Sequence, residues 1–395
     1  MLETAKPIGT PLARTRELPL AVMLRQLDWL LLAGIAALVG YGLWAVAGVT
    51  AHEVAGQPHY YLAKQEFYTG VGAVMLIIAA ALSPDLYRRY WRALYLVAIL
   101  TLLLVPLLGV AKRGSRRWLQ IGSFQFQPSE FAKLLVLLAL AGFLAERGRA
   151  LRDLSTVIGV LILVAIPTGL VFMQPDFGTA LVYAAVTAAV LLIAGTRWQY
   201  LGTLAITAVV GASLLIWALP ALGVHVLKPY QTQRLTGFIH PSFDPTRATY
   251  NVAQSKVALG AGGLHGRGTV GSTQTVLGFL PENHTDFIFA AIGEEHGFVG
   301  TSILLALYLF VVWRGLRALT NAGDGYGAVV IGGIVATLVF QVFVNVGMTM
   351  GMAPITGIPL PLVSVGGSSL IANLVALGVL IGAQMRGEGA YRKLR

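Results

Sequence analysis

The stretch FLPENHTDFIFAAIGEEHGFVG, at positions 279–300, gathers residues that could carry acid–base or binding chemistry. Glu282, His284 and Asp286 alternate directly before an apolar run. A carboxylate or imidazole at the mouth of an apolar helix could accept a proton from a substrate or help to hold a cation. The alternatives are that Asp286 caps the following helix, that His284 only makes ordinary hydrogen bonds, and that the alternation is a weak metal signal.

Other charged residues lie within or between apolar runs. Glu130 and Lys133 in PSEFAK are spaced i,i+3, so their side chains share one helical face and can pair. Asp176 in QPDFGTA lies in a very short connection, where it could line a cavity or cap the next helix. Glu294 and Glu295 point about 100° apart on a helix, so we expect only one to face the interior, with Lys133 as a conceivable partner.

Two basic segments accompany these acids. KRGSRRWLQIGSFQFQPSE, at 112–130, includes Arg116, Arg117 and Trp118, and a long loop at 221–286 includes Arg234. Arginine offers a bidentate fork to phosphate oxygens, so both segments, together with Lys133, could hold an anionic ligand. Contact with anionic lipid headgroups is the alternative. Trp118 could stack on a sugar or anchor the chain at the membrane interface.

Two glycine-rich segments remain. GAGGLHGRGTVGS, at 260–272, lacks the Lys-Ser/Thr ending of a phosphate-binding P-loop and is better interpreted as a flexible loop. GIPLPLVSVGGSS, at 357–369, contains Ser368 and precedes the last apolar run. Non-helical backbone at a membrane mouth can line a cavity, and its free N–H groups can face an anion. Ser368 is therefore a further candidate for a binding site.

Composition places all these residues in a membrane protein. The 395 residues are 56% hydrophobic and only 11% charged, and the mean hydropathy is +0.74. Apolar runs of about 18 residues or more recur from residue 28 onward. The absence of cysteine excludes disulfides and thiolate metal sites. A net charge of +11 is normal for basic cytoplasmic loops, and it does not indicate nucleic acid as a partner.

The apolar runs predict an all-α integral membrane protein with about ten spans and one long extracytoplasmic loop. We divide it into an N-terminal tail at 1–26, a single membrane domain at 27–385 with the long loop at 221–286, and a C-terminal tail at 386–395. Most of the basic residues fall on the side of the termini, which predicts that both termini are cytoplasmic. The expected spans are 28–49, 67–83, 93–111, 128–146, 154–173, 179–195, 201–220, 287–313, 326–350 and 365–384.

Taken together, the motifs resemble the SEDS family of polytopic membrane glycosyltransferases. The resemblance covers nearly the whole chain after the tail. The matching blocks, in the order of the family, are RRWLQIGSFQFQPSEFAKL, MQPDFGTAL, PYQTQRLTGFIHPSFDPTRATYNVAQSKVALGAGGLHGRG, FLPENHTDFIFAAIGEEHGFVG and GIPLPLVSVGGSS. The segments YNVAQSKVALGAGGLHGRG and STQTVLGFLPE look more like the elongation branch of the family than the division branch.

The resemblance implies a fold, a reaction and partners. Family members have a GT-C-like polytopic fold and polymerise lipid II, a disaccharide-pentapeptide on undecaprenyl pyrophosphate, into peptidoglycan in the bacterial cytoplasmic (inner) membrane. They work with a class B penicillin-binding protein as transpeptidase. The essential aspartate of the family falls on Asp286 in HTDFIF. Arg116, Arg117, Lys133 and Arg234 are then candidates for pyrophosphate contacts, and Glu130 and Asp176 for lining the cavity. No cofactor is certain, and a divalent cation (Mg²⁺ or Mn²⁺) stays open.

Two positions depart from the family pattern. Gln125 stands where relatives often have a basic residue, and Val365 where they often have tyrosine, so a cation and a phenol at these positions are in doubt. Three other functions remain to be separated from the polymerase by experiment. They are a flippase for lipid II, another transferase that uses a lipid-linked glycan, and a non-enzymatic scaffold of the elongation or division complex.

Overall fold

The computed structural model describes residues 25–112, 115–122, 124–223 and 247–392. A helix occupies each predicted span: α2 (Trp29–Val49), α3 (Tyr60–Ala81), α5 (Trp91–Leu108), α6 (Pro128–Arg147), α7 (Leu154–Met173), α8 (Phe177–Ile193), α9 (Trp198–Ser213), α15 (Ile288–Thr320), α16 (Gly325–Thr349) and α17 (Gly367–Arg392). Among the described residues, seven helices are long and apolar enough to cross a membrane, and α8 is a shorter apolar helix. A total of about ten spans, like the division into tails and one domain, stays a prediction.

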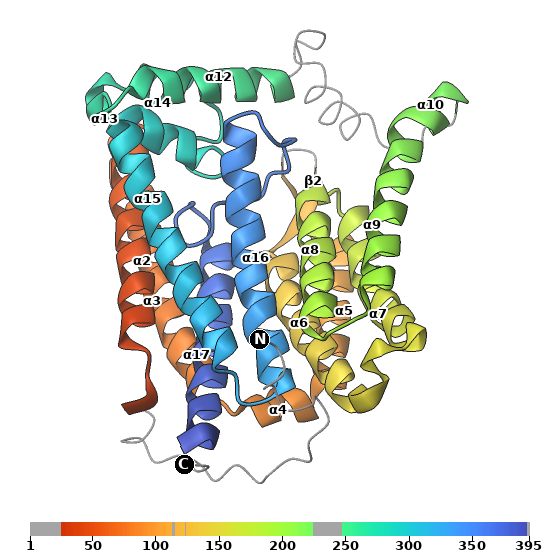
Figure 1. The fold of residues 1–395 in the computed structure, drawn as a ribbon. Coiled ribbons are helices and arrows are strands. Elements are labelled where there is room, and N and C mark those ends of the chain that lie inside the picture. The colour runs from red at the N-terminus through yellow and green to blue at the C-terminus, as the bar shows by residue number, and fades with distance from the viewer. Residues whose placement is uncertain (1–24, 113–114, 123, 224–246, 393–395) are drawn as a thin grey trace.

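Short elements connect the spans. They are α4 (Pro84–Arg89), a 3₁₀ turn (Gly148–Arg152), a π-helical stretch (Leu214–Ala218) that continues α9 into α10 (Leu219–Ala221), and then α12 (Arg247–Gly262), α13 (Gly268–Gly271) and α14 (Thr273–Val276). In Figure 1, α12 lies crosswise over one end of the bundle. We call this the α12 end. Part of the predicted long loop is therefore a helical layer.

A small sheet departs from the purely helical expectation. Strands β1 (Val110–Lys112), β2 (Ser115–Ile121) and β3 (Phe124–Phe126) pair antiparallel in the order β1-β2-β3. Arg116 pairs with Ala111, Trp118 with Val110 and Leu119 with Phe126. The sheet presents the basic segment directly before α6 begins.

The interior of the bundle is built from α6, α16 and α17. Most residues of α6 are buried, and α17 packs along α3 while α16 packs against α8 and α15. Large apolar side chains of α5, α7 and α9, such as Leu96, Ile162 and Ile206, are instead exposed on the surface of the bundle. A protein whose outer helices expose apolar side chains faces lipid there, because lipid tails solvate them as well as a core would.

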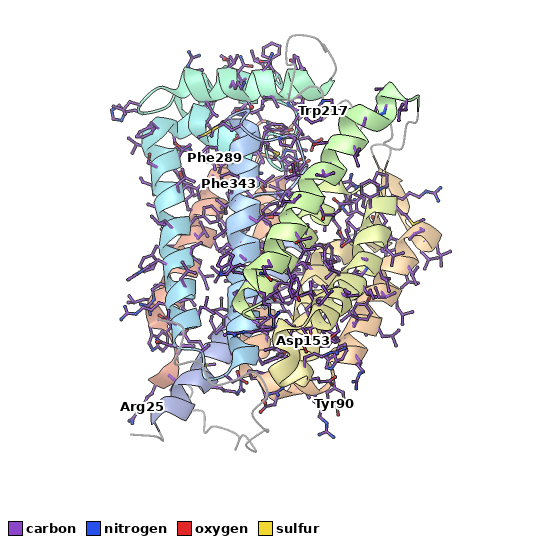
Figure 2. The ribbon with its side chains drawn as sticks, turned by 45° about the vertical axis from the view of Figure 1, so that its right-hand side comes forward. Arg25, Tyr90, Asp153, Trp217, Phe289 and Phe343 are labelled. Atoms are coloured by element: carbon purple, nitrogen blue, oxygen red, sulfur yellow. The ribbon has the colours of Figure 1, made fainter. Side chains whose placement is uncertain are left out.

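The end opposite α12 is closed by a polar clamp. Asp28 caps α2 by accepting a hydrogen bond from the backbone N–H of Leu31 at 3.0 Å. Its second oxygen lies 2.5 Å from Arg314 of α15 and accepts from Gln384 of α17 at 3.2 Å. Figure 2 shows Arg25, Tyr90 and Asp153 at this end, and Trp217 and Phe289 toward the α12 end.

Helix α15 is interrupted at Gly297, which has φ 65° and ψ −161°. The loop after α12 accepts hydrogen bonds from the backbone N–H groups that the break leaves without a partner in the helix. The N–H of Phe298 donates to the carbonyl of Gly263 at 2.9 Å, and the N–H of Val299 donates to the carbonyl of Leu264 at 3.1 Å. A Cβ atom on Gly297 would overlap the backbone of residues 264–266. Only glycine combines this positive φ with such close contact.

Candidate functional site

The segment that carries Asp286 is a tight turn directly before α15. Phe287, and not Asp286, occupies the N-cap position of that helix. The backbone N–H groups of Thr285 and Phe287 both donate to the carbonyl of Glu282, at 3.2 and 3.0 Å. Glu282 itself has φ 55°, an uncommon conformation for a residue with a side chain. Asp286 is half-buried as a residue.

Three consecutive carbonyls hold this turn in place. The carbonyl of His284 accepts from the backbone N–H of Val365 at 2.9 Å, and that of Thr285 accepts from the Ser364 hydroxyl at 2.6 Å. The carbonyl of Asp286 accepts from Nδ2 of Asn345 at 2.9 Å. The main chain around Asp286 is therefore fixed by the loop before α17 and by α16.

The loop before α17 is itself anchored by buried amide groups. Nε2 of Gln65 in α3 donates to the carbonyl of Ser364 at 3.0 Å, and Oε1 accepts from the N–H of Gly366 at 3.3 Å. Gln65 is only 2% exposed and Asn345 is fully buried. The sequence reasoning overlooked both residues and Ser364, although buried amides on apolar helices are a signal that could have found them.

His284 is oriented from the loop between α2 and α3. Its Nδ1 lies 2.9 Å from Oδ1 of Asn283 and 3.8 Å from Oε1 of Glu53. The ring also packs against Tyr61, with centroids 4.7 Å apart. The nearby imidazole of His284 lowers the pKa of Glu53 against the opposing effect of burial, and Asn283, whose Nδ2 donates to Glu53 at 2.7 Å, lowers it further. Glu53 was also missed at the level of sequence.

Ser368 connects the loop before α17 with the start of α6. Its hydroxyl donates to the carbonyl of Gln125 at 2.8 Å and accepts from the N–H of Gln127 at 3.0 Å. Ser368 is only 5% exposed, and its hydroxyl makes both of these hydrogen bonds to groups within the protein. Residues 364–368 thereby link the turn of Asp286 to the segment that leads into α6.

Asp176 is the N-cap of α8 and the centre of a buried polar cluster. It accepts from the N–H of Thr179 at 3.2 Å and from its hydroxyl at 2.9 Å. Nη1 of Arg117 lies 3.6 Å away. Gln127 and Ser129 complete the cluster, each at 3.4 Å. The cap interpretation is confirmed, and the carboxylate also holds the sheet against α6 and α8.

The predicted anion-binding residues differ in their surroundings. Arg116 is exposed, and Trp118 is half-buried beside it on β2. The guanidinium of Arg117 is engaged by Asp176 and by the carbonyl of Pro175. Arg234 lies outside the described residues. Of the three basic candidates that the structure describes at the α12 end and in α6, only Arg116 presents an exposed side chain.

Glu130 and Lys133 form the predicted ion pair. Nζ of Lys133 lies 2.8 Å from Oε2 of Glu130, and the side chains are 8% and 3% exposed. The pair borders a cavity of about 30 Å³ between α6, α16 and α17, to which Thr337 and Asn373 also contribute.

Lys133 does not pair with the acids of α15. Glu294 instead accepts from the N–H of Gln274 at 2.8 Å and from the N–H and hydroxyl of Thr275 at 3.0 and 2.8 Å. Glu295 is 2% exposed, and among the described residues neither of its oxygens has a hydrogen-bond donor. Glu294 and Glu295 are both buried, at 0% and 2% exposure, so the expectation that only one of them faces the interior is wrong. Lys133, the conceivable partner, pairs with Glu130 of its own helix instead.

The alternating residues Glu282, His284 and Asp286 do not gather into a metal site. Within the described ranges, no three His, Asp or Glu side chains gather closely enough to hold an ion. Glu282 turns back to accept from the Thr285 hydroxyl at 3.0 Å, and His284 turns toward Asn283. Residues that diverge in this way do not fit a bound divalent cation.

Comparisons with known proteins agree on one group of relatives. The family model FTSW_RODA_SPOVE, described as cell cycle protein, matches residues 25–388. The peptidoglycan glycosyltransferase MrdB of Escherichia coli K12 is 40% identical over 311 residues, 79% of this chain and 82% of the relative. A probable peptidoglycan glycosyltransferase FtsW of Thioalkalivibrio sulfidiphilus is 36% identical over 371 residues, 90% of this chain and 89% of the relative.

A solved structure shows the same architecture. It belongs to a peptidoglycan synthase complex described as coordinating polymerization and crosslinking. The chain superimposes on it with a TM-score of 0.78 at 31% identity, over 91% of this chain and 98% of that chain.

Proposed function

The chain belongs to the FtsW, RodA and SpoVE family, the SEDS glycosyltransferases of cell-wall synthesis, and from this membership we propose that it polymerises lipid II with Asp286 as general base. The observation that carries the assignment of Asp286 is the turn at its position. Three consecutive carbonyls fix the backbone of this half-buried residue. A carboxylate carried by a fixed backbone supports the role of general base, because a reacting group must be held in a defined position.

The proposed reaction is an inverting glycosyl transfer. The 4-hydroxyl of the acceptor sugar attacks the anomeric carbon of the donor while the bond to pyrophosphate breaks and the leaving group departs with its electron pair. Asp286 accepts the hydroxyl proton, and basic side chains stabilise the charge on the departing pyrophosphate. No step in this scheme is routed through a metal ion.

Arg116 is the first candidate for the pyrophosphate contact, since its side chain is exposed next to Trp118. Arg117 is a weaker candidate for this contact, because its guanidinium is already bound by Asp176 and by the carbonyl of Pro175. Lys133 is buried at the cavity between α6, α16 and α17, and its ion pair with Glu130 balances its charge, so we rank it behind Arg116. Arg234 is the remaining candidate, outside the described residues.

The orientation in the membrane follows from the same assignment. We place the chain in the bacterial cytoplasmic membrane with the α12 end outside, because lipid-linked disaccharide is polymerised there. Arg25 and the end of α17 lie at the opposite end of the bundle, which supports cytoplasmic termini (Figures 1 and 2). Basic residues such as Arg88, Arg89 and Arg92 lie at that end as well, as short cytoplasmic loops require.

A class B penicillin-binding protein is the proposed protein partner. The solved relative belongs to a complex that couples polymerization with crosslinking, and a glycan polymerase needs a transpeptidase to crosslink its product. A role in elongation is proposed from the elongation-type blocks around α12 and α14, although division-type relatives cover a larger share of this chain.

The decisive experiment incubates the purified full chain with lipid II and resolves the products on a gel. Glycan chains made without any other polymerase support the proposal. If lipid II crosses the membrane of a vesicle and no glycan chains form, the protein is a flippase. If the sugar is transferred to another acceptor, the protein is a different glycan transferase. Retained function of an Asp286→Asn chain in cells would identify a scaffold. The same reaction with and without the class B partner, and with a chelator, tests the partner and the open divalent cation.

A further inference from the structure

Asn345 is a buried polar residue near the C-terminal end of an apolar helix. It lies in α16, and its side chain is fully buried. An amide in such surroundings costs free energy unless its hydrogen bonds are made inside the protein. Its NH₂ group makes two of them, at 2.9 Å to the carbonyl of Asp286 and at 2.8 Å to the carbonyl of Ile358.

The orientation of this amide follows from its partners. Both neighbours are carbonyl oxygens, which only accept, so the NH₂ group must face them. The two hydrogens of one nitrogen are then shared between two segments, the turn before α15 and the loop before α17. The second segment also reaches back to the same turn through Ser364 and Val365.

We propose that Asn345 is a positioning residue that fixes the direction of the Asp286 carboxylate. The inference rests on the proposed role of Asp286 as general base. The contact is with the carbonyl of Asp286 itself, so it restrains the peptide unit that directly follows the Cα atom bearing the carboxylate. Asn345 does not touch substrate in this scheme, and it acts only through Asp286. A displacement of a reacting group by about 1 Å can cost about 10²-fold in rate, so such a restraint has a measurable effect.

Gln341 provides a matched control on the same helix. It precedes Asn345 by one helical turn and is 1% exposed, so it too is a buried amide of α16. None of the hydrogen bonds described for the turn of Asp286 involves Gln341. A variant that only disturbs the packing or polarity of α16 should behave alike at both positions.

The experiment compares the purified full-length variants Asn345→Leu and Gln341→Leu with the wild-type chain in lipid II polymerisation. We expect Asn345→Leu to lower kcat by about 10- to 100-fold with KM for lipid II within about 3-fold. Gln341→Leu should keep both parameters within about 3-fold of wild type. Equal losses in the two variants, or a wild-type kcat in Asn345→Leu, would overturn the proposal.

A second variant covers the case in which Asn345→Leu does not fold. Ser364→Ala removes the donor to Thr285, the neighbour of Asp286, and leaves a small side chain in place. It should lower kcat in the same way, by about 3- to 30-fold, because it loosens the same turn. A wild-type kcat in a folded Ser364→Ala chain would then count against the proposal.

A double-mutant cycle with Asp286→Glu separates positioning from general damage. This variant keeps a carboxylate but displaces it, so loss of Asn345 should cost at least about 3-fold less in its background than in the wild type. Full additivity would show that Asn345 acts independently of Asp286. An inactive wild-type chain would instead refute the proposed polymerase, and an active Asp286→Asn chain the base assignment.

Discussion

The Ser364 hydroxyl donates a hydrogen bond to the carbonyl of Thr285 at 2.6 Å, although the two residues are 79 positions apart in the chain. The same hydroxyl accepts from the N–H of Leu360 at 2.8 Å. One side chain therefore closes a turn of its own loop and holds the turn that carries Asp286. The geometry around Asp286 depends on two segments folding against each other.

Replacing Asp286 by asparagine should abolish most polymerisation without unfolding the protein. A positioned base contributes about 10² to 10⁴ in rate, equal to about 3 to 5 kcal/mol, and the amide of asparagine cannot accept the proton. The backbone contacts of residue 286 use its carbonyl and survive the change. Lipid II turnover on gels measures the effect, and thermal unfolding in detergent checks the fold. A wild-type rate would show that another group is the base.

Replacing Lys133 by methionine should destabilise the bundle strongly. The change leaves the carboxylate of Glu130, 3% exposed, buried without its ammonium partner at 2.8 Å. Breaking one half of a buried pair typically costs about 3–5 kcal/mol. The double variant Lys133→Met with Glu130→Gln should recover most of that loss, because no charge is then left unpaired. The unfolding midpoints of both variants in detergent measure this recovery. A double variant as unstable as Lys133→Met alone would show that the unpaired carboxylate is not the cause of the loss.

Replacing Ser368 by alanine should lower stability through the loss of two buried hydrogen bonds. The carbonyl of Gln125 and the N–H of Gln127 would both lose their partner, at a cost of about 1–3 kcal/mol. Ser369 is the matched control, since its described side-chain contact is a local one from Asn373 at 3.3 Å. Ser369→Ala should unfold within about 0.5 kcal/mol of the wild type. Equal behaviour of the two alanine variants in thermal unfolding would refute the bridging role of Ser368.

Replacing Gly178 by alanine should destabilise the contact between α8 and the loop before α17. A Cβ atom there would lie 2.6 Å from the carbonyl oxygen of Thr356 and 2.8 Å from Ile358. Overpacking against backbone typically costs about 1–3 kcal/mol. Gly169 in α7 has open space around its Cα, so Gly169→Ala should be neutral or stabilise by up to about 1 kcal/mol. The unfolding midpoint should fall for Gly178→Ala and should stay unchanged or rise for Gly169→Ala.

Glu53 should make stability depend on acid pH. Its folded-state pKa is lowered from the ordinary value of 4.5, chiefly by the nearby imidazole of His284. The carboxylate therefore stabilises the fold fully above about pH 4.5, and this contribution is lost as pH falls through the folded-state pKa. The difference in unfolding midpoint between wild type and Glu53→Gln should be largest at neutral pH and shrink below about pH 4.5. A difference that grows on acidification would reverse the sign of this linkage.

The positions of the spans could be predicted because long apolar runs have few alternatives in a membrane. The helix α6 begins at Pro128, where the proline was expected at the first helical position. The sheet of β1, β2 and β3 escaped prediction, because strands of three to seven residues leave little periodic signal. The helix α12 escaped for a different reason, since its glycine-rich end suggested a flexible loop.

The candidate site was only partly readable from the sequence. The spacing of Glu130 and Lys133 sufficed to predict their pairing, because the i,i+3 relation is local. The contacts of Gln65, Asn345 and Ser364 join distant parts of the chain, and no local pattern specifies them. The contact of Arg117 with Asp176 could not be predicted either, because it depends on how the sheet packs on α8.

The break at Gly297 gives α15 two mechanical parts. A continuous helix of 33 residues would act as one lever, so that a push on the α12 layer would swing the clamp of Asp28 and Arg314 at the far end. The loop after α12 is bonded on both sides of the break, because Arg267 N–H donates to the carbonyl of Glu294 at 2.9 Å and Phe298 N–H donates to the carbonyl of Gly263 at 2.9 Å. A displacement of the α12 layer therefore acts on α15 at the break, close to the turn of Asp286, and not along one rigid helix.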